Sequence, residues 1–118
     1  MFVPEEIRKE VGLYLLELDG IPVAQFLELE IEVDRSRLVL LNGLSADLTL
    51  DHWYDDTVSN PGAANRSGSV VAMSTSNQEV ARVSFKVANL AIYEGPQHDH
   101  HSAQGPVTRL ALDCDSLV

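Results

Sequence analysis

Apolar and polar residues alternate along most of the chain, as is typical of β-strands. The clearest example is the stretch of residues 21–34, in which apolar residues take odd positions: Val23, Leu27, Leu29, Ile31 and Val33. Successive side chains of a strand point to opposite faces, so these residues are predicted to share one face. The other face would then be acidic and carry Glu28, Glu30, Glu32 and Asp34.

Several further segments also read as strands separated by turns. Residues 12–18 precede an Asp19-Gly20 turn signal and form a predicted hairpin with the acidic strand. A short strand over 38–41 is followed by a predicted turn at Asn42-Gly43 and then by the segment "SADLTL". Two strands within residues 69–87 are joined by a polar turn around Ser76-Asn77, and residues 107–114 alternate again.

The strand that begins near Glu79 changes its apolar parity. Ala81, Val83, Phe85 and Val87 are odd, whereas Leu90 and Ile92 are even. A strand that leaves one sheet and joins another turns its corner through a bulge or bend, and its inward face changes there. We therefore predict one continuous strand with a corner at Ala88-Asn89.

One helix is predicted, at about residues 50–59. Trp53 and Thr57 share a face there, and Pro61 follows where a helix could not continue. Residues 1–11 are expected to form a short helix or an arm that orders against a neighbour. The prediction is a mainly β fold, an antiparallel β-sandwich or partly open barrel with this single helix.

Length and composition fit one domain over residues 1–118. No segment approaches the roughly 20 apolar residues of a membrane span, and the start lacks the apolar core of a secretory signal. We therefore expect a protein made in the cytoplasm, without membrane contact. The formal net charge is −10, which argues against specific nucleic-acid binding because phosphates need cationic partners.

Candidate chemistry is sparse. The loop His98, Asp99, His100 and His101 could hold a ligand or metal in a small binding module, although adjacent loop residues rarely converge on an ion. The solitary Cys114 is expected to act as a small buried hydrophobe. Serine and glycine contexts match neither a nucleophile elbow nor a phosphate-binding loop. We expect no enzyme, no cofactor and no metal.

The acidic face has two interpretations. Same-face carboxylates along a strand lie roughly 6.6–7 Å apart, inside a Debye length of about 8 Å. The face could be solvated surface whose repulsion is relieved by Arg35, Arg37 or Lys86. Alternatively, it could line a shared polar channel or meet a basic partner.

The order of these segments resembles the tail tube proteins of contractile phage tails and phage-tail-like injection systems, whose fold the type VI secretion tube protein shares. "YLLELDGIPVAQFLELEIEV" resembles the opening hairpin of that family, and "LTLDHWYDD" resembles its passage from a strand into the helix. The stretch "RSGSVVAMSTSNQEVARVSFKVANLAIYEGP" is the best match. Its family-like positions are Arg66, Gly68, Ser69, Glu79, Val80, Ala81, Arg82, Phe85, Asn89, Tyr93, Gly95 and Pro96.

The resemblance implies a structural subunit that forms a homo-oligomeric ring, a hexamer in the family, within a virion or injection particle. Stacked rings would form an inner tube with an acidic lumen face, and sheath or baseplate proteins would be neighbours. Residues 34–46 are shorter than the corresponding family segment, which commonly helps one ring grip the next. The chain could therefore be a tube subunit, an initiator or a cap.

Overall fold

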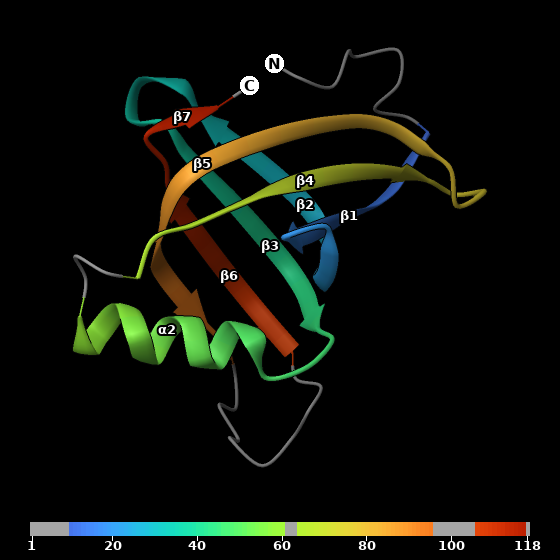
Figure 1. Cartoon of the computed structure of the whole chain (residues 1–118). Helices are drawn as coiled ribbons and strands as arrows, with labels where there is room; N and C mark the ends of the chain where they lie inside the picture. The colour runs from blue at the N-terminus through green and yellow to red at the C-terminus, as the bar shows by residue number, and fades with distance from the viewer. Residues whose placement is uncertain (1–9, 61–63, 96–105, 118) are drawn as a thin grey trace.

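The computed structural model describes residues 10–60, 64–95 and 106–117, and it confirms the predicted mainly β fold with one helix (Figure 1). Every strand pairing is antiparallel. The elements run in the order β1 (Val11–Leu18), β2 (Ile21–Glu32), η1 (Val33–Arg35), β3 (Arg37–Ser45), α2 (Thr49–Ser59), β4 (Arg66–Ser74), β5 (Glu79–Glu94), β6 (Pro106–Asp113) and β7 (Ser116–Leu117).

Two walls face each other across the core. One wall contains β1, β4 and the first half of β5, and the other follows the order β2-β3-β6-β5. The β1 and β2 strands pair only near their shared turn, from Tyr14–Phe26 to Leu18–Ile21. Figure 1 shows β5 as a long curved strand that passes from one wall to the other. The result is a partly open barrel, since several strands pair along only part of their length.

The corner in β5 is confirmed, but it lies before the predicted residues. Val83 and Phe85 are buried on one parity, whereas Ala88 and Leu90 are buried on the other. Because Arg66 pairs with Ala88 and Gly68 with Phe85, Lys86 and Val87 together lie opposite Ser67. This two-against-one arrangement is a β-bulge. Val87 adopts φ 52°, and its side chain is 42% exposed rather than inward as predicted.

A second change of face makes part of the β2 prediction wrong. Val23, Ala24 and Phe26 are buried, whereas Leu27 is 66% exposed and Val33, in η1, is 73% exposed. Beyond Leu27, Leu29 and Ile31 pack against the core as predicted. The core-facing residues of β2 thus change from Ala24 and Phe26, at even numbers, to Leu29 and Ile31, at odd numbers.

The predicted turn at Asn42-Gly43 is instead a bend inside β3. Asn42 adopts φ 57° while β3 continues to Ser45. A Cβ atom at Gly43 would lie 2.4 Å from Cδ1 of Phe26 and 2.2 Å from the Gln25 carbonyl oxygen. Glycine is therefore required for Phe26 to approach β3. Three residues separate the end of β3 at Ser45 from the start of α2 at Thr49.

The helix closes one end of the barrel, as Figure 1 shows. Leu50 and Trp53 are its buried side chains, and Nε1–H of Trp53 donates a 2.7 Å hydrogen bond to the Ala64 carbonyl. The Tyr93 hydroxyl on β5 donates to Oδ1 of Asp51 at 3.1 Å. The helix predicted at about 50–59 is thus confirmed. Of the predicted N-terminal segment, residues 1–9 lie outside the described residues, and Val11 already belongs to β1.

We predict that Phe85→Ala lowers the free energy of unfolding by roughly 3–5 kcal/mol, because it removes a fully buried ring and leaves a cavity. Denaturant titration followed by circular dichroism measures the change. Val58→Ala is the control, since Val58 is 65% exposed and should shift stability by no more than about 0.5 kcal/mol. Equal midpoints for both variants would contradict the assigned core.

We predict that Val87→Asn raises the stability by about 1 kcal/mol, because a β-branched residue is strained at positive φ and asparagine tolerates that region. Val80→Asn is the matched control on the same strand. Val80 is half-buried without a positive φ, so its replacement should lower stability. A lower unfolding midpoint for Val87→Asn than for wild type would show that the corner carries no strain.

Candidate functional site

The predicted acidic stripe is present on the outer face of β2, but it has three members rather than four. Glu28, Glu30 and Glu32 alternate with the core-facing Leu29 and Ile31. Asp34 lies beyond the strand in η1. Below, the acidic stripe means Glu28, Glu30 and Glu32.

Positive charge reaches the stripe at its Glu32 end. Nη1 of Arg35 lies 4.0 Å from a Glu32 carboxylate oxygen, and Nδ2 of Asn42 donates to Oε2 of Glu28 at 3.2 Å. No ion pair among the described residues involves Glu30. Arg37, expected to relieve the stripe, lies opposite Glu32 across β2 and β3 and interacts with it electrostatically, although its hydrogen bonds go to Asp113. Positive charge is therefore close to Glu32, whereas Glu28 and Glu30 have no ion pair among the described residues.

The Arg37–Asp113 pair is bidentate. Nε of Arg37 donates to Oδ1 at 2.6 Å, and Nη2 donates to Oδ2 at 3.1 Å. This hydrogen bonding to Asp113 raises the pKa of Arg37 against the effect of burial. Lys86, the third expected cation, lies on β5 and does not face β2.

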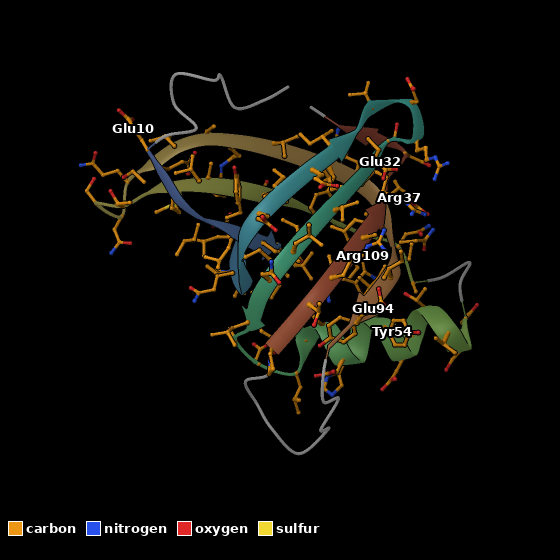
Figure 2. The ribbon with its side chains drawn as sticks, turned by 180° about the vertical axis from the view of Figure 1, so that it is seen from behind. Glu10, Glu32, Arg37, Tyr54, Glu94 and Arg109 are labelled. Carbon is orange, nitrogen blue, oxygen red and sulfur yellow. The ribbon has the colours of Figure 1, made fainter. Side chains whose placement is uncertain are left out.

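The stripe belongs to a broader outer face formed by the β2-β3-β6-β5 wall. Glu28 pairs with Leu41, Leu41 with Arg109, and Arg109 with Glu94. In the neighbouring row, Val39 and Ala111 are buried although they lie on this face. Figure 2 shows Glu32, Arg37, Arg109 and Glu94 on the same side of the molecule. The outer face therefore has acidic groups along its β2 side, whereas Val39 and Ala111 in its central row are covered from solvent.

Both borders of this wall have unpaired edges. Residues 27–32 of β2 pair with β3, and no other described strand pairs with them. Residues 89–94 of β5 pair with β6 around a register shift at Ala91, and the β4 pairing stops at Ala88, so no described strand pairs with their other side. Each border thus presents backbone donors and acceptors that a further strand could satisfy.

The family-like residues are mostly structural members of the other wall. Arg82 on β5 bonds Oε1 of Glu17 at 2.9 Å and Oε1 of Glu79 at 2.8 Å, which raises its pKa, mainly through Glu79. Gly68 permits close strand contact, because a Cβ there would lie 2.1 Å from the Glu17 carbonyl oxygen. Phe85 is in the core.

Four further family-like residues, Arg66, Ser69, Val80 and Ala81, lie on β4 or on the first half of β5, whereas Asn89 and Tyr93 pair with β6. Nη2 of Arg66 donates to Oδ2 of Asp19 at 3.3 Å, and the hydroxyls of Ser69 and Ser84 lie 3.1 Å apart across β4 and β5. Val80 and Ala81 are half-buried on β5, and Gly95 follows its end. Pro96 lies outside the described residues.

In residues 10–60, 64–95 and 106–117, no group of three or more His, Cys, Asp or Glu side chains could hold a metal ion. The candidate loop His98–His101 lies outside them. The described helices include none that is long and apolar enough to cross a membrane.

Sequence reasoning missed an apolar area beside the acidic stripe. Two shallow depressions of about 230 and 200 Å3 lie on the outer face of β1, β2 and β3, and both include Gln25 and Leu44. Leu27 lies between this area and Glu28, and the alternation pattern placed it in the core. The Asn42-Gly43 pair was the available signal, since it marks where the strand pair changes face.

Comparison with protein families, with curated proteins and with solved structures finds no match for this chain.

Cys114 is predicted to react slowly with thiol reagents in the folded protein. It is half-buried, its Sγ lies 3.7 Å from the Leu112 carbonyl oxygen, and burial beside Asp113 and Asp115 raises the pKa of the thiol to about 12. Since the thiolate is the nucleophile, labelling by a disulfide reagent at neutral pH should be about a hundredfold or more slower than in denaturant. Equal rates would show an open thiol.

Proposed function

We propose that this chain is a structural subunit of a contractile phage tail or phage-tail-like particle, and that it forms or caps the inner tube by ring assembly. The observation that carries the proposal is the β2-β3-β6-β5 wall, with an unpaired edge at each border and an acidic outer face. The resemblance in sequence to tail tube proteins supports the same assignment.

The unpaired edges support a head-to-tail ring. An exposed sheet edge invites pairing with another chain, and natural proteins cover or pair it. Here one edge lies on β2 and the other on β5, at opposite borders of one wall. Pairing the β2 border of one copy with the β5 border of the next uses both edges, and a suitable rotation closes the ring.

The acidic stripe suits the inner surface of such a ring. Carboxylates offer no attraction to nucleic-acid phosphates, so DNA or an acidic cargo could slide past without being held. Placing the stripe on a channel wall also explains why Glu30 has no cationic partner among the described ion pairs.

The short link between β2 and α2 favours a cap or an initiator over a subunit of a long tube. Residues 34–46 contribute to η1, Ser36, β3 and the residue after it, so no long loop projects from this part of the wall. In the family that the sequence resembles, a longer loop here helps stacked rings grip each other. Sheath or baseplate proteins would then supply the neighbouring surfaces.

Ring assembly is tested by native mass spectrometry and negative-stain electron microscopy of the purified protein. Wild type should form closed rings, with six copies expected from the resemblance. Ala91→Lys should abolish them, because Ala91 is an exposed residue on the β5 border and an edge lysine blocks strand addition while leaving the fold intact.

Gln78→Lys is the matched control. It makes the same change in charge at an exposed turn position away from both borders, so rings should persist. A wild-type protein that stays monomeric at every concentration would exclude self-assembly. Rings formed equally well by Ala91→Lys would exclude the β5 border as the contact.

A further inference from the structure

The outer face of β1, β2 and β3 combines apolar depressions with the acidic stripe. The depressions are lined by Leu13, Leu15, Pro22, Gln25, Leu27 and Leu44. Leu27 is 66% exposed and Leu44 is 48% exposed. Glu28 follows Leu27 directly, so the apolar area and the acidic stripe form one surface along β2. This surface is apolar up to Leu27 and acidic from Glu28 onward.

The size of the depressions indicates a polypeptide occupant. Each measures about 200–230 Å3, which is below the roughly 300–1,000 Å3 typical of small-molecule pockets. Two adjacent hollows that share Gln25 and Leu44 fit two apolar side chains of a docked segment. Exposed apolar patches rimmed by polar residues commonly mark protein contacts.

Charge decides which kind of segment fits. Among the described residues, no lysine or arginine lines either depression, and the neighbouring stripe is acidic. Carboxylates at alternate positions of a strand lie roughly 6.6–7 Å apart, which is also the spacing of alternate side chains in an extended segment. An extended chain with basic residues at alternate positions would place one cation near each glutamate.

A second copy of this protein is a poor occupant. Two copies docked face to face through the depressions would bring their acidic stripes within about one Debye length, roughly 8 Å at physiological salt. Each copy also carries a formal net charge of −10. Repulsion would therefore oppose the contact that the apolar residues favour.

We propose that this surface binds an extended cationic segment of another protein, with apolar side chains in the depressions and basic side chains over the acidic stripe. This inference needs only a single subunit and does not depend on ring formation. If the proposed ring forms, the same face would line its channel, and the segment would belong to a molecule that enters or closes it.

The test uses a fluorescein-labelled peptide in which leucine-serine is repeated twice and lysine-serine is then repeated three times. Fluorescence anisotropy should show saturable binding that weakens at high salt. Leu27→Ser combined with Leu44→Ser should weaken binding about tenfold, since both replaced side chains are exposed and lie in the depressions. Glu30→Gln should also weaken it and reduce the salt dependence.

Matched controls lie on α2. Val58→Ser replaces an equally exposed apolar residue, and Asp55→Asn replaces an exposed carboxylate, so both should bind the peptide as wild type does. Thermal unfolding checks that all variants fold. Absence of binding by wild type, equal binding of a peptide with glutamate in place of lysine, or unchanged binding by Leu27→Ser with Leu44→Ser would overturn the proposal.

Self-association is measured in parallel by sedimentation. A dimer that disappears in the variant carrying Leu27→Ser and Leu44→Ser would assign the surface to a second copy and would also overturn the proposal. Rings that are lost in Ala91→Lys but persist in the variant carrying Leu27→Ser and Leu44→Ser would support ring assembly, whatever the peptide experiment shows. Failure of one proposal can therefore be distinguished from failure of the other.

Discussion

The strand β5 belongs to both walls, and the rest of the structure depends on this constraint. Its first half pairs with β4 and its second half with β6, so one strand joins the two sheets. To bury Phe85 before the corner and Leu90 after it, the strand must insert an extra residue. Val87 provides that residue at φ 52°, with its N–H 3.3 Å from the Ser67 hydroxyl oxygen.

This arrangement also determines which edges stay unpaired. Since β4 follows β5 only to the corner, residues 89–94 have β6 alone as a described strand partner. At the opposite border of the same wall, β2 continues beyond its pairing with β1. Residues 27–32 therefore have no described strand partner on that side. The acidic stripe lies along that second border. Edge and charge thus occur together on one border, which is the basis of the proposed ring, and the same stripe borders the apolar depressions of the proposed docking surface.

Several parts of the fold could be predicted from the sequence because short-range patterns encode them. The alternation around Phe85, the Asp19-Gly20 turn and the helix around Trp53 each depend on neighbouring residues. The acidic stripe was predicted for the same reason. Its fourth expected member, Asp34, lies in η1, because the alternating run of residues continues past the point where the strand ends.

The changes of face could not be placed from the pattern alone. The sequence showed that β5 must switch parity, but the choice between Val87 and Ala88-Asn89 depends on how Ser67 of β4 lies opposite the bulge. In β2, alternation suggested that Leu27 was inward, whereas the fit of Phe26 over Gly43 of β3 turns it outward. Leu27 lines one of the two apolar depressions because of that change of face.

By itself, the amino-acid sequence determined a mainly β fold, its helix and an acidic strand face, since these follow from composition and from contacts a few residues apart. Tertiary structure decided which borders remain unpaired, which carboxylate hydrogen-bonds to Arg37 and which leucine side chains are exposed to solvent. Those outcomes depend on contacts between strands far apart in the chain, such as Arg37 with Asp113. Local periodicity carries no information about them.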